Sequence, residues 1–445
     1  MRLTVHRGGH QIGGTCVELS TARSRIIIDF GMPLQDAFGA DFNERALEGM
    51  SLSDLIAKKV LFDIKGLYHD STPSVDAILI SHSHKDHCGL LPYINPQIPV
   101  YISNGAYKLM NALNIFLPVS KRTIINSPVI LQDKQPVEIG DFTITPYRVD
   151  HSGFDSMGFL IRETATGKTV LYSGDFRAGG WTHKRFTDFI SNPPKGVDCL
   201  LMEGTMIARE GGKYPDEMAV VQGVVEVINK SQNPVIPVYC SGSNIDRIVA
   251  LYKAVLKTKS LLVIDSYTAS MLKAAKSVCD SIPAVGTNNI KVFIENYGHG
   301  DIYVNKIRAS GQNDFIRRLG VKKIKADKFG QLKQKSLLLM RNTMISVVEK
   351  IPQIQGSTLI YSLWDGYIKR DTPDAKKTLD FIKRNNLKKV HIHTSGHATL
   401  QILKEFASKI NARQIIPIHT EYPERFKEHF GSTVVCYKDG QPFDV

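Results

Sequence analysis

The stretch Ser81-His82-Ser83-His84-Lys85-Asp86-His87 holds four side chains able to bind a metal ion within six residues. It directly follows residues 75–80, an apolar run that predicts a buried strand. A turn at a strand end can direct several side chains at one point, and imidazole and carboxylate are ligands that zinc and related ions prefer. Histidines also cluster by chance on surfaces, but the position behind a buried strand favours a metal centre.

The spacing His-x-His-x-Asp-His resembles the signature of the metallo-β-lactamase superfamily. The resemblance implies an αββα sandwich with metal ions at the mouth between its two sheets. It also implies further ligands after later strands, and His151 and Asp175 follow strands expected over residues 142–149 and 169–172. Asp29, at the end of an early strand, matches an acid that orients a ligand in this family.

The family pattern implies two Zn²⁺ ions, with Mn²⁺ or Mg²⁺ as alternatives. The expected ligands are His82, His84 and His151 for one ion and Asp86, His87 and His419 for the other, with Asp175 bridging them. A pair of cations can hold a bridging hydroxide and stabilise the charge that develops on a phosphate during in-line displacement. The metal site alone does not name a substrate, because the superfamily also contains lactamases and thioesterases.

The rest of the chain divides by its pattern of elements. Residues 1–205 are rich in short strands, with an inserted helix expected over residues 43–60. Strands and helices alternate over residues 206–385, which indicates a parallel sheet built from βαβ units. We therefore predict an α/β protein with a metallo-β-lactamase domain over 1–205, an inserted domain over 206–385 and the end of the first domain over 386–445.

The second half resembles the β-CASP branch of nucleic-acid nucleases, and most closely the ribonuclease J family. The glycine-rich start over residues 8–14 also resembles that family. Glu203 ends a strand, and His397 lies in the stretch His393-Thr394-Ser395-Gly396-His397. The resemblance implies that Asp86, Glu203 and His397 take part in catalysis, with Glu203 supporting His397 as the group that protonates the leaving 3′ oxygen. Histidine suits this role because its pKa lies near neutrality.

Two strand-to-helix turns are candidate phosphate sites. Ser243, Asn244 and Arg247 lie at the start of one predicted helix, and Ser395 and Gly396 precede another. Free backbone N–H groups at a helix start favour anions, although helix capping by serine or asparagine explains the same residues. Trp364 and Tyr367 follow a strand and could stack on bases or pack in a core.

Composition bears on the partner and the compartment. The net charge is +13, with basic runs near residues 317–328 and 376–389. These runs favour a polyanionic partner over a solvated basic surface that has no specific partner. The six cysteines are scattered singly, as in reduced cytoplasmic proteins, although Cys88 adjoins the histidines. The sequence predicts no membrane span and no signal peptide, and it leaves a homodimer open.

The leading interpretation is a ribonuclease that hydrolyses phosphodiester bonds of single-stranded RNA by a two-metal hydroxide mechanism, as a 5′ exonuclease, an endonuclease or both. In the family, members acting on DNA carry an apolar residue in the place of His419, which favours RNA. A DNA nuclease of the same architecture is the alternative, followed by a small-molecule hydrolase and a non-catalytic RNA-binding protein. With 26 residues after His419, we expect no counterpart of the further C-terminal domain of ribonuclease J.

Overall fold

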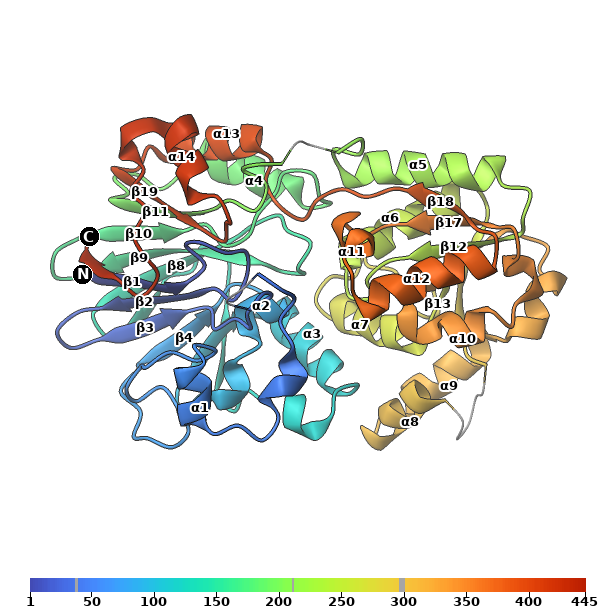
Figure 1. Ribbon diagram of the computed structural model, residues 1–445, viewed down its shortest axis with the longest axis horizontal. Helices are drawn as coiled ribbons and strands as arrows, with labels where there is room; N and C mark the ends of the chain where they lie inside the picture. Colours follow the sequence, from blue (N-terminus) through green and yellow to red (C-terminus); the bar gives the residue numbers. More distant parts are fainter. Residues whose placement is uncertain (37–38, 210–211, 296–300) are drawn as a thin grey trace. The chain divides into compact units, whose positions relative to one another are not determined.

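The computed structural model describes residues 1–36, 39–209, 212–295 and 301–445 (Figure 1). The chain forms two compact units. Unit 1 comprises Met1–Met110, Ser120–Glu210 and Gly396–Val445, and unit 2 comprises Asn111–Val119 and Gly211–Ser395. None of the helices in these described ranges has the length and apolar character needed to cross a bilayer.

Unit 1 contains two β-sheets. In sheet order, the first consists of β20 (Pro442–Asp444), β1 (Arg2–Arg7), β2 (Cys16–Ser20), β3 (Arg25–Ile28), β4 (Ala77–Ile80), β5 (Val100–Ser103) and β6 (Pro128–Leu131). The second consists of β19 (Gln414–Ile418), β11 (Cys199–Glu203), β10 (Thr169–Tyr172), β9 (Met157–Glu163), β8 (Phe142–Arg148) and β7 (Val137–Ile139). A strand from the C-terminal part of the chain thus completes each sheet, β20 the first and β19 the second.

Helices cover the outer faces of the two sheets (Figure 1). On the first sheet they are α1 (Leu52–Ala57), α2 (Lys85–Cys88) and α3 (Asn104–Asn114), and on the second α4 (His183–Ser191), α13 (Leu400–Ile410) and α14 (Pro423–Phe430). Alternate strand residues such as Leu3, Ile26 and Phe159 form one core between the sheets, and two further cores lie under the helices. The predicted αββα sandwich is therefore confirmed.

Unit 2 contains a parallel sheet. Its order is β15 (Lys323–Ile324), β14 (Ile290–Phe293), β13 (Leu261–Ile264), β16 (Ser336–Met340), β12 (Val235–Tyr239), β17 (Thr358–Tyr361) and β18 (Lys388–His391). Its helices are α5 (Glu217–Lys230), α6 (Ile245–Lys257), α7 (Ser266–Lys276), α8 (Ile302–Ala309), α9 (Asn313–Lys322), α10 (Ile345–Val348), α11 (Gly366–Lys369) and α12 (Pro373–Arg384). This confirms the parallel α/β sheet expected from the alternating pattern.

The helix predicted over residues 43–60 is wrong as one element. A 3₁₀ turn, η1, spans Glu44–Leu47, and α1 begins only at Leu52. Gly49 separates them with φ of 80°, a left-handed backbone that ends a helix and that glycine adopts without strain. Ser51 then starts α1 with a capping box to Asp54.

Candidate metal centre

The histidine stretch is held in place by its backbone. α2, which carries Asp86 and His87, is a single turn, too short to be stable by itself. The loop after β3 binds it: Phe30 N–H donates to the carbonyl of His87 at 2.7 Å and Met32 N–H to that of Lys85 at 3.0 Å. Tertiary contacts therefore fix the turn that directs these side chains.

Three histidines form the first group of potential ligands. His82 Nε2 lies 3.0 Å from His84 Nδ1, and His151 Nε2 lies 3.3 Å from the same atom. His151 Nδ1 lies 2.5 Å from the carbonyl oxygen of Gly396. Because a carbonyl oxygen can only accept, Nδ1 carries the proton and Nε2 presents a lone pair to the group.

A second group contains Asp86, His87 and His419. His419 Nε2 lies 3.3 Å from Asp86 Oδ2, and His87 Nδ1 lies 2.7 Å from Asp29 Oδ2, to which it donates. His87 Nε2 is consequently a buried lone pair, and it has no hydrogen-bond partner among the described residues. A buried imidazole lone pair directed at other potential ligands fits a metal ligand.

Asp175 lies between the two groups. Its Oδ2 is 3.1 Å from His87 Nε2, 3.7 Å from His419 Nε2 and 3.9 Å from His82 Nε2. Atoms that share an ion at bond lengths of about 2.0–2.2 Å must lie roughly 3–3.5 Å apart. The donor types, the spacing and the orphaned nitrogen of His87 therefore fit divalent cations on either side of Asp175.

Burial and neighbouring charge shift the pKa values of the candidate ligands in both directions. Burial lowers the pKa of His87, but Asp175, Asp29 and Asp86 outweigh it and raise that pKa well above its usual value, so these carboxylates favour positive charge here. Burial, together with the surrounding histidines, lowers the pKa of His82 well below its usual value, and burial also lowers the pKa of His151. These imidazoles stay neutral and able to ligate. Burial alone would raise the pKa of Asp175, but His419 and His87 outweigh it and hold that pKa well below the usual range.

Glu203 and His397 form an acid–histidine pair beside Asp175. Glu203 is buried, and its carboxylate accepts from the backbone N–H groups of Thr205 at 3.0 Å and Ala398 at 3.1 Å. His397 Nδ1 lies 3.4 Å from Glu203 Oε2. Burial lowers the pKa of His397, but the Glu203 carboxylate outweighs burial and raises it overall. The His397 side chain is 21% exposed, whereas the neighbouring acids are 1–2% exposed, so it can meet a substrate.

Unit 1 thus brings together every expected ligand, the expected catalytic pair and Asp29. Two supporting residues escaped the sequence reasoning. Tyr172 O–H donates to Asp29 Oδ2 at 2.7 Å, and Thr205 Oγ1 lies 2.7 Å from His419 Nδ1. Tyr172 ends β10 and Thr205 follows β11, so each lies next to a candidate site residue. This position at a strand end is the sequence signal by which they could have been predicted.

The remaining predicted substrate-binding residues lie mostly in unit 2. Asn244 caps α6, accepting from Arg247 N–H at 3.0 Å, and Ser243 Oγ lies 3.0 Å from Ser241 Oγ. Ser395 ends unit 2 and Gly396 resumes unit 1. Their roles stay predictions, with capping observed for Asn244.

Arg247 is fully buried, and its guanidinium donates to Glu217, to Ser362 and to the carbonyl of Thr394. These contacts direct the side chain into the protein. Arg247 therefore links the ends of β17 and β18 to α5 and α6. This geometry does not favour a direct contact between Arg247 and a substrate.

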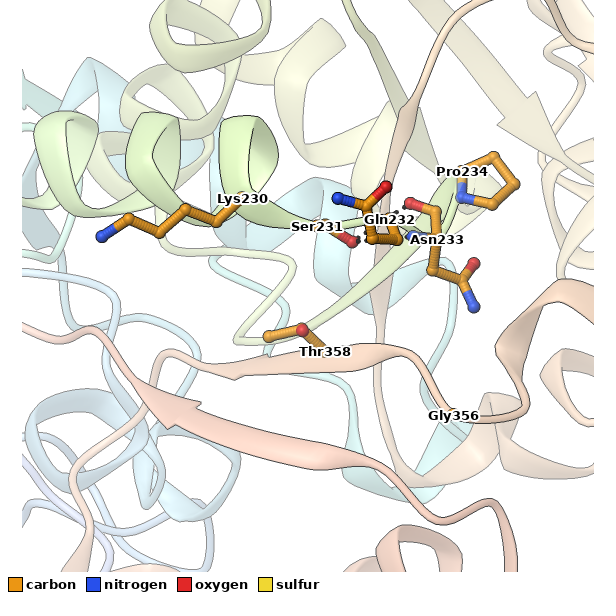
Figure 2. A pocket seen from close by; sticks show the side chains of 7 residues that line it. All are labelled: Lys230, Ser231, Gln232, Asn233, Pro234, Gly356 and Thr358. Atoms are coloured by element: carbon orange, nitrogen blue, oxygen red, sulfur yellow. Dashed lines mark hydrogen bonds between the residues drawn. The ribbon is translucent and has the colours of Figure 1, made fainter.

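A surface hollow of about 390 Å³ lies elsewhere in unit 2. Figure 2 shows its lining at the end of α5 and beside β17, made of Lys230, Ser231, Gln232, Asn233, Pro234, Gly356 and Thr358. It contains no histidine, cysteine or carboxylate and none of the predicted site residues. The hollow is therefore a weaker candidate for the functional site than the histidine cluster of unit 1.

Two protein families match this chain. Residues 58–233 match the family described as beta-lactamase superfamily domain, and residues 384–435 match the Zn-dependent metallo-hydrolase RNA specificity domain. The first range contains His82 to His87, His151, Asp175 and Glu203, and the second contains His397 and His419. Nearly all the residues of the candidate centre therefore fall in these matched ranges.

Curated relatives cover most of this chain. Ribonuclease J of Helicobacter pylori is 23% identical over 98% of this chain and 58% of its own length. Ribonuclease J of Sinorhizobium meliloti is 25% identical over 78% of this chain and 58% of its own. Transcription termination factor FttA of Methanothermobacter thermautotrophicus is 23% identical over 67% of this chain and 46% of its own. The chain thus spans about 58% of the length of these ribonuclease J relatives.

A solved structure shares the whole fold. The crystal structure of a protein of unknown function from Enterococcus faecalis V583 superposes with a TM-score of 0.75, at 21% identity and 99% coverage of both chains. The family matches and the relatives, with the fold and the residues of the centre, support one assignment: a ribonuclease J-like β-CASP member of the metallo-β-lactamase superfamily.

Proposed function

We propose that this protein is a metal-dependent ribonuclease that hydrolyses phosphodiester bonds in RNA. The observation that carries the proposal is the Glu203–His397 pair next to the seven potential ligands, with His397 Nδ1 3.9 Å from Asp175 Oδ2. A general acid beside two cation positions suits phosphodiester cleavage, where charge develops on the phosphate and on a leaving oxygen. The similarity to ribonuclease J and to an RNA specificity domain supports RNA as the substrate.

We propose two zinc ions, with manganese or magnesium as alternatives, held by the two ligand groups and shared by Asp175. When bound, the ions supply Lewis acidity for phosphate oxygens and lower the pKa of a water molecule. The protein's part is to keep His82, His84 and His151 neutral and to hold His87 through Asp29. Asp86 and Asp175 balance the charge of the cations.

His397 is proposed to protonate the leaving 3′ oxygen. Glu203 raises the pKa of His397, which favours the imidazolium form that donates a proton. Because both Glu203 oxygens also accept backbone N–H groups, the carboxylate cannot turn away from the imidazole. The pair is thereby poised to give up one proton at a defined place.

The test uses one RNA sequence prepared with a 5′ monophosphate, with a 5′ triphosphate and as a circle, and compares it with single-stranded DNA. Cleavage of the circle would establish endonuclease action, and a need for the 5′ monophosphate would support the predicted phosphate sites near Ser243 and Ser395. If the protein cleaves DNA as fast as RNA, the alternative function, a DNA nuclease, replaces the proposed one. Asp86→Ala serves as the inactive control.

A matched pair of histidine variants tests the acid. His397→Ala is expected to lower kcat by about 10²–10⁴-fold, the usual contribution of a general acid, while His429→Ala on α14 should leave it unchanged. Metal content, measured by elemental analysis, should stay the same in both variants. Unchanged kcat in His397→Ala would exclude this role.

Location and assembly complete the proposal. We propose a cytoplasmic protein, the domain boundaries predicted from the sequence, and a homodimer as a form to be tested. Sedimentation of the purified chain at several concentrations decides between monomer and dimer.

A further inference from the structure

Two aromatic side chains stand exposed at the carboxyl end of β17 in unit 2. Trp364 is 36% exposed and Tyr367 is 51% exposed, while their neighbour Ile368 is buried. Ile368 belongs to the core of unit 2, and the two aromatic residues do not. Core packing therefore does not account for Trp364 and Tyr367.

The two rings and an arginine form one cluster. The ring centroids of Trp364 and Tyr367 lie 5.4 Å apart at 85°, and Arg370 Cζ lies 5.5 Å and 5.4 Å from their respective centroids. A Cβ atom on Gly366 would lie 2.3 Å from Trp364 Cη2. The indole thus rests on the backbone of Gly366, and a glycine there is required for this orientation.

Positive charge surrounds the rings. Asp365 pairs with Lys369 at 2.7 Å and with Lys389 at 2.9 Å, so one carboxylate holds two ammonium groups close to the aromatic cluster. Arg370 adds a third basic side chain beside the rings. Lys389 Nζ also lies 5.4 Å from the ring centroid of Tyr361, at the end of β17.

The neighbouring strand fixes the segment. His391 Nε2 donates to the carbonyl of Leu363 at 2.9 Å, and His391 pairs in register with Tyr361. The turn that carries Trp364 is therefore tied to β18 on one side and continues into α11 on the other (Figure 1). A binding surface that is held before the ligand arrives loses less entropy on binding.

We propose that Trp364, Tyr367 and Arg370 form a base-stacking platform for single-stranded RNA. This inference rests on the proposed function and adds a contact for the substrate in unit 2. Exposed rings offer faces to bases of any sequence, and the adjacent cations attract the phosphate backbone. Trp, Tyr and Arg are also common at protein interfaces, but the lysine and arginine side chains beside the rings favour a polyanionic partner here.

The chain contains two tryptophans, Trp181 and Trp364, which allows a direct test. In Trp181→Phe, fluorescence reports on Trp364 alone. Titration with a ten-nucleotide oligouridylate, with chelator present to prevent cleavage, should quench this emission. An abasic ribose-phosphate oligomer of equal length should bind more weakly and quench little, because it carries charge without bases.

Affinity variants in the otherwise unchanged chain provide the decisive comparison. Trp364→Ala should raise the Kd for oligouridylate roughly tenfold, Tyr367→Ala several-fold, and Trp364→Phe little, as base stacking on aromatic rings predicts. Leu379→Ala, which removes another exposed apolar side chain of unit 2 (48% exposed), is the control. Equal thermal unfolding of all variants would show that the fold is intact.

The outcomes separate this inference from the proposed function. Kd values unchanged in Trp364→Ala and Tyr367→Ala would overturn the platform, even if the protein cleaves RNA. Quenching and weakened binding in the variants would support the platform, even if no RNA is cleaved and the proposed activity fails. An effect of Trp364→Ala on self-association alone would also overturn it and point to a protein contact.

Discussion

Asp29 is a single buried residue on which several parts of the candidate centre depend. It has φ of 56°, a left-handed conformation that aspartate tolerates better than most residues. Its carboxylate accepts from Ser81 N–H at 2.8 Å, Ser81 Oγ at 2.7 Å, Tyr172 O–H and His87 Nδ1. The β4 end, β10 and α2 thus share one anion, which sets the orientation of His87.

Asp29→Asn should weaken metal binding about 10–100-fold, the usual effect of losing a group that orients a ligand. Asparagine keeps the size and tolerates the left-handed backbone, but its amide cannot accept from all four donors. Competition with a metal-binding dye measures the affinity. Asp188→Asn, an exposed carboxylate on α4, is the control, and equal affinity in both variants would contradict the role given to Asp29.

At the scale of elements, the one-turn helix α2 depends on close backbone contact with the loop after β3. Gly31 N–H donates to the Thr15 carbonyl at 2.9 Å, and Thr15 N–H donates to that of Asp86 at 3.0 Å. A Cβ atom on Gly31 would lie 1.7 Å from the Asp86 carbonyl oxygen. The absence of a side chain at this position is therefore what lets the loop approach the ligand turn.

Gly31→Ala must displace either the loop or α2, because the clash is with backbone. We expect lost or strongly reduced metal binding, together with destabilisation of about 3 kcal/mol or more, above the usual 1–3 kcal/mol of overpacking. Gly212→Ala has nothing within 4 Å of the added Cβ and should be neutral. Chemical unfolding and metal content check both variants, and normal metal content in Gly31→Ala would refute the argument.

The outer face of β1 to β3 carries an ion-paired glutamate that links strand pairing to pH. Glu18 accepts from His6 Nε2 at 2.8 Å and from Arg25 Nε at 2.7 Å. Burial raises the pKa of Glu18, but hydrogen bonds from His6 and Arg25 outweigh burial and lower it overall below 4.5. A carboxylate with a lowered pKa stabilises the folded state above its unfolded pKa, and this stabilisation is lost as pH falls through the folded value.

Glu18→Gln should therefore lower the free energy of unfolding by about 1–3 kcal/mol at pH 7, the range for hydrogen bonds to charged groups. The difference from the unchanged chain should shrink as the pH falls through the lowered pKa of Glu18, because the glutamate then becomes protonated. Unfolding curves at pH 7 and pH 3 measure it, with the exposed Glu405→Gln as control. A difference independent of pH would show that packing, not charge, is responsible.

At the scale of the whole molecule, the two units have separate cores. The described cores of unit 1 gather residues of its three chain segments, and one described core of unit 2 lies within residues 235–387. All the candidate ligands belong to unit 1. A bound ion therefore stabilises unit 1 directly. The gain in its free energy of unfolding increases with the ratio of the free ion concentration to the Kd.

Chelation should lower the unfolding temperature of unit 1 and leave that of unit 2 nearly unchanged. Bound ligand at 100 times its Kd contributes about 2.7 kcal/mol, enough to separate two transitions by several degrees. Calorimetry with and without chelator tests this, and Asp86→Ala should resemble the chelated chain. One transition shifting as a whole would instead show that the units unfold together.

The residues of the centre could be predicted because local sequence patterns reveal them. Features that depend on pairing or packing between distant segments could not be predicted in this way. His82 to His87 lie in one turn, and β12, β13 and α12 have patterns that match their observed bounds closely. Strand β16 was not foreseen, although it lies between β13 and β12, because its apolar run resembles a buried helix as much as a strand. The exposure of Trp364 and the burial of Arg247 depend on tertiary packing, which no local pattern reports.

The discontinuity of unit 1 has a consequence for synthesis on the ribosome. Strand β19 pairs with β11, and β20 pairs with β1, the first strand of the described residues. A nascent chain that stops before residue 396 lacks His397, His419 and both of these strands. The centre can thus be completed only after residue 419 has been translated and has left the exit tunnel, and the first sheet only after β20, which ends at Asp444. A prematurely terminated product would therefore lack the complete set of candidate ligands.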